Sequence, residues 1–196
     1  LHLSLRRQRQ MCIRDSLKSL LQIHIVFLDL HRVIIFLHTG AFFSGHNELD
    51  DIVDLAISAA KRGYVAVSIN YRLGLNIVST YSGERAVYRG LKDASAVDTN
   101  LREFHQELGI NPDNIFLWGS SAGSFISLHL AYSEEDERPE STYGGGSDPD
   151  LGCIDCSGNS YQHSSKPNAI VSEVVKTALP TLLCVVLICN HLIFLS

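Results

Sequence analysis

The stretch Leu-Trp-Gly-Ser-Ser-Ala-Gly-Ser at 117–124 constrains the fold of this chain more than any other. It contains the order Gly-x-Ser-x-Gly, which on its own is also common in turns that are merely rich in small residues. Here an apolar run at 115–118 precedes it and an amphipathic segment at 124–132 follows it. This context favours a buried strand that enters a helix through a sharp turn, with a serine at its tip.

The turn predicts a nucleophile and part of its environment. A serine hydroxyl is a poor nucleophile at neutral pH, so it must be exposed, aimed and paired with a base. Ser121 occupies the tip, and Gly119 and Gly123 suit a turn in which strand and helix approach too closely for a Cβ atom. The N–H of Ala122 begins the helix and is expected to point at a substrate oxygen. Ser120 is expected to pack or to hydrogen-bond locally.

Strands and helices alternate over most of the chain. Short apolar runs predict buried parallel strands, and apolar residues at helical spacing predict amphipathic helices. We expect strands at 33–37, 65–69, 115–118 and 168–172, helices at 48–62, 84–108 and 124–132, and a turn at 111–113. Gly63 and Gly109 are expected to end the first two helices. The sequence therefore predicts the α/β class, with a doubly wound, mostly parallel sheet.

Charge and cysteine content exclude several classes of function. With 16 basic against 21 acidic residues, the net charge is −5, so we expect no nucleic-acid partner. The acidic run at 134–137 is expected to be a solvated loop. Cys153 and Cys156 form a lone C-x-x-C, which leaves open a local disulfide or two free thiols but lacks the four ligands of a zinc site. No G-x-G-x-x-G follows the first strand, and neither a metal nor another cofactor is expected.

Three further segments carry a family resemblance. They are His-Thr-Gly-Ala-Phe-Phe-Ser-Gly at 38–45, Ile-Asn-Tyr-Arg-Leu at 69–73 and Gly-Ile-Asn-Pro-Asp-Asn-Ile at 109–115. With them the chain resembles an α/β-hydrolase of the carboxylesterase type, nearest the bacterial feruloyl- and acetyl-esterase-like branch. The resemblance runs from Val33 to Ser172, the N-terminal half to two-thirds of such a domain. It implies a small-molecule ester substrate, with acylated carbohydrate as one candidate.

The resemblance also implies how the loop at 38–45 acts. In this family the loop reads His-Gly-Gly and supplies N–H groups to the oxyanion hole, which here match Gly40 and Ala41 beside Ala122. Thr39 replaces the first glycine, so it is expected to strain or shift the loop if its position requires a positive φ. His38 is expected to structure the loop and not to act as the base.

The acid and base of the predicted triad are not evident. The family order is Ser, then Asp or Glu, then His, on loops after later strands. His129 lies on the helix after Ser121 and points away from it, and His163 lies in a polar loop. His191 lies in the apolar tail, and the acids at 148, 150 and 155 come too early. The triad acid and base are therefore unknown, and we expect this chain to be an inactive fragment of an esterase.

The two ends of the chain differ from its centre. Residues 1–32 begin without methionine and include a segment that reads like translated adaptor sequence, so this segment is expected to be non-native or poorly defined. Residues 33–173 form the partial α/β-hydrolase domain, truncated after the strand that follows the nucleophile helix. Residues 174–196 form an apolar tail, for which a membrane span, a buried helix and an out-of-frame sequence are the competing interpretations.

The sequence thus predicts a serine carboxylic-ester hydrolase that forms an acyl-enzyme on Ser121 above a backbone oxyanion hole. One alternative is a non-catalytic α/β-hydrolase-like binding module. Another is a membrane-anchored hydrolase-like protein, although a membrane partner is not the favoured expectation. Localisation is undetermined: a secreted or periplasmic parent protein fits a polysaccharide esterase, and a cytoplasmic one is the alternative.

Overall fold

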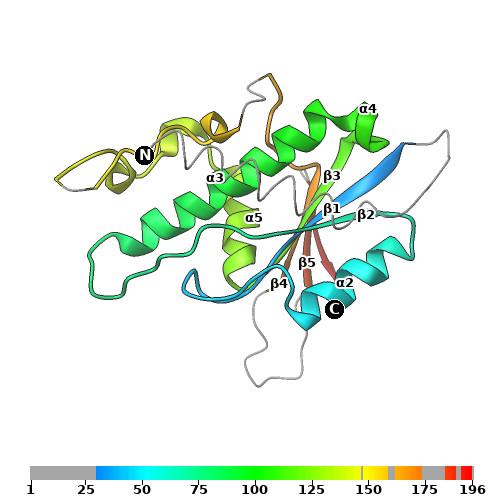
Figure 1. Cartoon of the computed structure of the whole chain (residues 1–196), viewed down its shortest axis with the longest axis horizontal. Coiled ribbons are helices and arrows are strands. Elements are labelled where there is room, and N and C mark those ends of the chain that lie inside the picture. The colour runs from blue at the N-terminus through cyan, green and yellow to red at the C-terminus, as the bar shows by residue number, and fades with distance from the viewer. Residues whose placement is uncertain (1–29, 147, 159–161, 174–183, 189–190, 196) are drawn as a thin grey trace.

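A six-stranded sheet organises the molecule (Figure 1). The structure, a computed structural model, describes residues 30–146, 148–158, 162–173, 184–188 and 191–195. The strands lie in the order β2-β1-β3-β4-β5-β6, and the first four run parallel. Their bounds are His31–Leu37 for β1, Val65–Ile69 for β2, Ile110–Ser120 for β3, Ala169–Glu173 for β4, Cys184–Ile188 for β5 and His191–Leu195 for β6. The predicted α/β class with a mostly parallel sheet is confirmed.

Helices cover both faces of this sheet. Helix α2 (Asp50–Ala60) packs on one face, and α3 (Ser82–Glu103) and α5 (Ala122–Tyr132) lie on the other (Figure 1). Alternate side chains of β3 show why both faces are buried: Leu117 belongs to the core under α3 and α5, and Trp118 packs with the smaller core under α2.

The single helix expected at 84–108 is divided in two. Helix α3 ends before Phe104, and the short helix α4 (His105–Leu108) follows, closed by Gly109 in the left-handed conformation with φ 65°. The ring of His105 lies with Nδ1 2.8 Å from the carbonyl oxygen of Arg102. The ring of His105 is therefore placed to hydrogen-bond one of the carbonyl groups at the C-terminal end of α3, which have no partner within the helix.

The turn expected at 111–113 lies within β3 as an irregularity. Pairing with β1 passes from His31 opposite Ile110 to Val33 opposite Ile115, so four residues of β3 lie across from a single residue of β1. The N–H of Asp113 donates to Oδ1 of Asn111 at 2.9 Å, which closes an Asx turn there.

The described parts of the apolar tail at 174–196 differ from both helical interpretations, the membrane span and the buried helix. Its described parts are strands β5 and β6, which pair antiparallel with each other and extend the sheet beyond β4. Short runs rich in Val, Ile and Leu are compatible with a strand as well as with a buried helix. The spacing of the apolar residues therefore does not distinguish the two. No helix in the described ranges is both long enough and apolar enough to cross a membrane.

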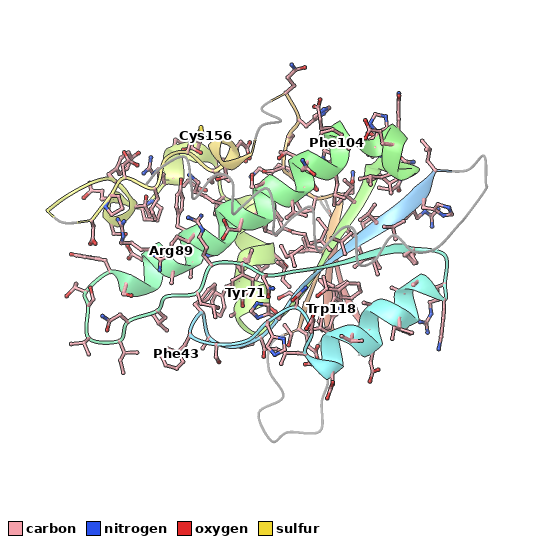
Figure 2. The ribbon with its side chains drawn as sticks, viewed as in Figure 1. Phe43, Tyr71, Arg89, Phe104, Trp118 and Cys156 are labelled. Carbon is pink, nitrogen blue, oxygen red and sulfur yellow. A yellow bond between two sulfur atoms is a disulfide. The ribbon has the colours of Figure 1, made fainter. Side chains whose placement is uncertain are left out.

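The connection between α5 and β4 packs along α3. It contains three short 3-10 helices, η1 (Glu135–Glu137), η2 (Glu140–Thr142) and η3 (Asp155–Ser157). Cys153 and Cys156 are joined in a disulfide, which decides between the two states left open by the sequence; Cys156 lies beside α3 (Figure 2). The acidic run is not purely solvated, because Glu135 Oε2 accepts the N–H of Ile154 at 2.8 Å.

Candidate active site

Ser121 stands at a strained turn between β3 and α5. Its backbone has φ 51° and ψ −110°, outside the regions that a serine usually occupies. A Cβ built on Gly119 would lie 2.2 Å from the carbonyl oxygen of Gly123, and one built on Gly123 would lie 2.2 Å from the carbonyl oxygen of Leu37. Both glycines therefore permit the close approach of strand and helix from which the serine projects.

Hydrogen bonds hold this turn against the neighbouring strand. The N–H of Ser121 donates to the carbonyl oxygen of Glu173 at 2.9 Å, and the N–H of Ser124 donates to the carbonyl oxygen of Ser121 at 2.9 Å. The buried hydroxyl of Ser124 lies 2.7 Å from Gly119 O and 2.9 Å from Glu173 O. Hydrogen bonds with β3, β4 and α5 therefore hold the backbone of Ser121 in its strained conformation. Such a conformation persists only where the surrounding structure enforces it.

The loop after β1 turns sharply at Gly40. This residue has φ 123°, and a Cβ there would lie 1.9 Å from the carbonyl oxygen of Ser44. The N–H groups of Phe43 and Ser44 both donate to Gly40 O at 2.9 Å. The N–H groups of Gly40, Ala41 and Ala122 donate to no other residue within the described ranges.

The expected strain at Thr39 occurs at other residues. Thr39 does not have a positive φ, whereas Ala41 and Phe42 have φ 52° and 59°. Threonine therefore replaces glycine at a position that does not need left-handed backbone, and the two following residues carry the strain instead.

His38 packs beneath this loop. Its ring is buried, stacks on Tyr71 with centroids 4.2 Å apart, and has Nδ1 2.6 Å from Thr39 O. The hydroxyl of Tyr71 donates to His38 O at 2.8 Å. Burial lowers the pKa of His38 from its ordinary value, so the ring is neutral near pH 7. These contacts link the Asn-Tyr-Arg segment after β2 to the loop.

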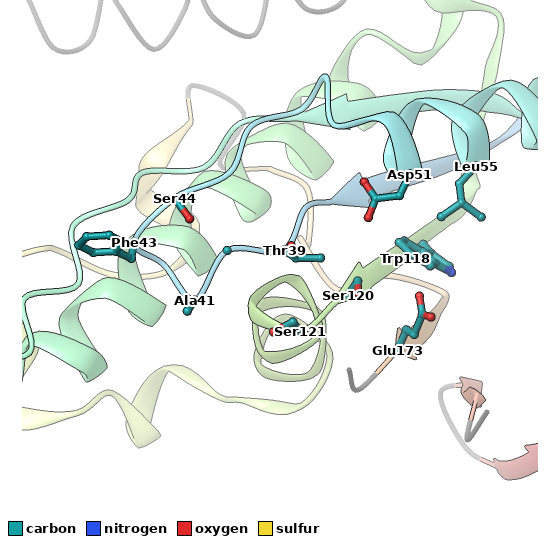
Figure 3. Close-up of a pocket in the computed structure, with 11 residues that line it drawn as sticks. Thr39, Ala41, Phe43, Ser44, Asp51, Leu55, Trp118, Ser120, Ser121 and Glu173 are labelled. Atoms are coloured by element: carbon teal, nitrogen blue, oxygen red, sulfur yellow. The ribbon is translucent and has the colours of Figure 1, made fainter. Parts of the chain in front are cut away.

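A cleft of about 810 Å³ joins the loop and the turn (Figure 3). Gly40, Ala41 and Ser121 line it together, although about 80 residues separate the loop from the serine. Ala122 is buried at the start of α5, with Gly119 and Gly123 in the turn itself. The rest of the lining consists of Thr39, Phe43, Ser44, Asp51, Leu55, Trp118, Ser120 and Glu173.

The candidate bases do not face this cleft. His129 Nδ1 lies 3.1 Å from Ser133 Oγ, near the far end of α5. His163 Nε2 lies 3.1 Å from Glu103 Oε2, at the end of α3 that leads to the start of β3. Ser121 follows the opposite end of β3, and since β3 pairs along the seven residues of β1, about 20 Å separate the two ends at the usual rise per residue. The side chain of His191 lies outside what the structure describes.

The acids considered in the sequence also serve other contacts. Asp150 pairs with Arg138, and Asp155 accepts hydrogen bonds from the hydroxyls of Ser95 and Ser165 at 3.0 and 2.5 Å. Asp148 pairs with Gly145 through backbone hydrogen bonds. Among the described residues, no histidine lines the cleft that contains Ser121.

The comparison with known families decides the wider assignment. The family model described as BD-FAE matches residues 28–190. The chain belongs to the BD-FAE family. This is an α/β-hydrolase esterase family, so the resemblance to carboxylesterase-type hydrolases is confirmed.

Individual relatives agree with this family. Acetylcholinesterase-1 of Trittame loki is 30% identical over 110 residues, which cover 54% of this chain and 19% of that protein. The para-nitrobenzyl esterase of Bacillus subtilis is 32% identical over 94 residues, covering 46% and 19%. A propionate-bound thermophilic esterase of Thermogutta terrifontis has the same fold, with a TM-score of 0.53, 23% identity, and coverage of 74% of this chain and 43% of that one. The chain thus spans about a fifth of the two curated relatives and less than half of the solved esterase.

Sequence reasoning missed three conspicuous residues of the cleft. Trp118 and Glu173 could have been found, because Glu173 ends β4, Trp118 lies two residues before the end of the neighbouring parallel strand β3, and the carboxyl ends of such strands meet at one edge. Asp51 gave no such signal, since an acidic residue in the first turn of a helix is common for electrostatic reasons alone.

Proposed function

We propose that Ser121 is the nucleophile of a serine carboxylic-ester hydrolase. The observation that carries this proposal is the strained backbone of Ser121, φ 51° and ψ −110°, between two glycines that tolerate no Cβ. A residue other than glycine persists in such a conformation only where its surroundings enforce it, and such residues cluster at functional sites. Family membership supports ester hydrolysis as the reaction.

In the proposed reaction Ser121 Oγ attacks the carbonyl carbon of the ester. The N–H groups of Gly40, Ala41 and Ala122 stabilise the oxyanion of the tetrahedral intermediate, at about 3 kcal/mol of barrier for each well-placed donor. The alcohol leaves with the electrons of the C–O bond and a proton, and an acyl-enzyme remains. Water then attacks the acyl carbon, releasing the carboxylic acid and restoring the hydroxyl of Ser121.

Proton transfer requires a base and its acid partner from outside the described residues. Without a base, serine attack loses most of its acceleration. We therefore propose that these 196 residues alone hydrolyse esters far more slowly than a complete triad would, with only the oxyanion hole and substrate binding to accelerate the reaction. A small ester is the proposed substrate; an acylated carbohydrate follows only from the resemblance to feruloyl- and acetyl-esterases.

A non-catalytic binding module is the second candidate. The observation that favours it is the lack of a described histidine beside Ser121. In that case the cleft binds its ligand and Ser121 contributes no chemistry.

Two measurements separate these candidates. Hydrolysis of p-nitrophenyl acetate is compared for the 196-residue chain and for a chain extended along its gene, each with and without Ser121→Ala. We expect activity in the extended chain that falls at least a thousandfold in Ser121→Ala, with Ser79→Ala, at an exposed loop serine, as the control. Peptide mapping after fluorophosphonate treatment is expected to find the adduct on Ser121 and not on Ser120. Equal activity with and without the Ser121 hydroxyl contradicts the enzyme proposal.

A further inference from the structure

The cleft beside Ser121 has one wall with a distinct chemical character. Trp118 and Ser120 lie two residues apart on β3, so their side chains share a face of the sheet. Glu173 is the register partner of Ser120 on the parallel strand β4 and shares that face. Helix α2 covers the same face and brings Asp51 over it.

The close-up shows how these side chains are arranged. Trp118 lies between the carboxylates of Asp51 and Glu173, with Ser120 and then Ser121 next along the cleft (Figure 3). An indole between two carboxylates, adjoining the proposed nucleophile, forms a continuous wall from three different elements, α2, β3 and β4.

The two carboxylates supply all the formal charge of the lining that the structure describes. Lysine, arginine and histidine are absent from those lining residues. Neither Asp51 nor Glu173 forms an ion pair within the described ranges, and the one hydrogen bond of the Asp51 carboxylate is to the N–H of the following residue, Ile52, at 2.9 Å. Two carboxylates thus face the cleft without a compensating cation from the described chain.

We propose that this wall binds a cationic group of the substrate, so that the cleft selects positively charged esters and rejects anionic ones. The proposal rests on the proposed function in one respect, because the cleft is taken to be the one in which Ser121 reacts. A tryptophan ring attracts a cation through its quadrupole, and the carboxylates add Coulomb attraction that is stronger beside a partly buried wall than in water. The same charges repel a carboxylate or phosphate on the substrate.

The electrostatics favour a quaternary or alkylated ammonium over a small, strongly hydrated cation. A soft cation gives up water of hydration at low cost and retains apolar contact with Trp118 and Leu55. The carboxylates come from separate elements, α2 and β4. The wall therefore presents an indole flanked by charge, a usual arrangement for alkylammonium recognition.

The test uses a reporter that needs no catalysis. Trp118 is the only tryptophan of the chain, so selective excitation of tryptophan fluorescence reports on this wall alone. The full chain is titrated with benzyltrimethylammonium, benzyl alcohol and benzoate, which share a phenyl ring and differ in charge. We expect saturable binding of the cation at least roughly tenfold tighter than that of the alcohol, and benzoate weaker than either.

Two substitutions and two matched controls locate the effect. Glu173→Gln and Asp51→Asn are each expected to reduce the preference for the cation roughly three- to tenfold. Asp113→Asn, at the exposed turn within β3, and Glu107→Gln, on α4, remove the same charge far from the cleft and are expected to leave the preference unchanged. Circular dichroism establishes that each variant is folded, and added salt is expected to weaken cation binding.

The outcomes separate this proposal from the proposed function. Repeating the titration with Ser121→Ala is expected to leave cation binding intact, because the hydroxyl is not part of the charged wall. If Ser121→Ala loses hydrolysis but still binds the cation, the result supports the role of Ser121 in the reaction and leaves the cationic subsite intact. Benzoate binding as tightly as the cation, no saturable change of Trp118 fluorescence with any probe, or a preference unaffected by both cleft substitutions overturns the cationic subsite.

Discussion

The backbone N–H of Ser121 donates to the carbonyl oxygen of Glu173 at 2.9 Å, which ties the strained turn to the end of the neighbouring strand. The same carbonyl oxygen lies 2.9 Å from the hydroxyl of Ser124. Glu173 therefore contributes to the site twice: its backbone supports the turn that carries the nucleophile, and its side chain lines the cleft. The position of Ser121 consequently depends on β4 as well as on its own strand and helix.

Removing the hydroxyl that shares this carbonyl should weaken the turn. Ser124 is buried, and its hydroxyl is within hydrogen-bonding distance of Gly119 O and Glu173 O. We expect Ser124→Ala to lower the free energy of unfolding by about 1–2 kcal/mol, because a buried acceptor loses its donor. Urea unfolding of the chain measures this, with Ser79→Ala at an exposed site as control. Equal midpoints for the two variants would count against the bond.

A methyl group at the turn should be far more costly. Gly123→Ala places a Cβ 2.2 Å from Leu37 O, and backbone cannot yield as a side chain can. We expect a loss of about 3 kcal/mol or more, in the range of severe overpacking. Gly145→Ala is the matched control, since a Cβ there meets no atom within 4 Å and the backbone is not left-handed. Thermal unfolding compares the two variants, and similar melting temperatures would contradict the close approach of α5 to β1.

The strain at Ser121 should be visible in stability as well as in activity. Glycine adopts positive φ without penalty, whereas alanine does not. We therefore expect Ser121→Gly to be more stable than Ser121→Ala by about 1 kcal/mol, despite the greater entropy of glycine in the unfolded chain. The same pair at Ser133, where φ is −73°, should show the opposite order. Chemical denaturation provides the four values, and alanine being the better residue at both positions would exclude the strained turn.

The buried ring of His38 predicts a dependence of stability on pH. Burial lowers its folded-state pKa below the ordinary 6.5, so below about pH 6.5 the unfolded chain binds a proton that the folded chain does not. The contribution of His38 is therefore complete above pH 6.5 and declines as the pH falls toward the folded-state pKa. The slope cannot exceed about 1.4 kcal/mol per pH unit for one group.

Unfolding free energies of the unmodified chain and of His38→Gln, measured between neutral and mildly acidic pH, test this dependence. We expect the difference between them to shrink on acidification, because the variant lacks the titrating ring. Ser79→Ala, at an exposed position without a titrating group, should run parallel to the unmodified chain. Parallel curves for all three proteins would indicate that the buried ring of His38 does not resist protonation.

Local chemistry explains why much of the fold could be predicted. The strand predicted at 65–69 coincides with β2, because its five consecutive small or apolar residues suit a strand that is buried on both faces. Gly119 and Gly123 identified the turn because no other residue fits a backbone approach that close. Both features follow from neighbouring residues, which a sequence displays directly.

Two features were not evident from the sequence, one of them local and the other dependent on pairing between strands. The break between α3 and α4 involves the bond from His105 back to Arg102, and β5 and β6 are recognisable only through their pairing beside β4. The same segment was open to helical interpretations because its apolar residues suit either structure.

The sequence by itself determined the α/β alternation, the esterase resemblance and the likeness of Ser121 to a nucleophile, because each rests on spacing along the chain. Only the tertiary structure brought Asp51, Trp118 and Glu173 to one wall of the cleft, and showed that the strain in the loop lies at Ala41 and Phe42 instead of Thr39. Parallel register aligns strand ends that lie 53 residues apart, and helix packing adds a residue from a third segment. The charge of the cleft is therefore a property of the folded sheet and cannot be read from any one stretch of the chain.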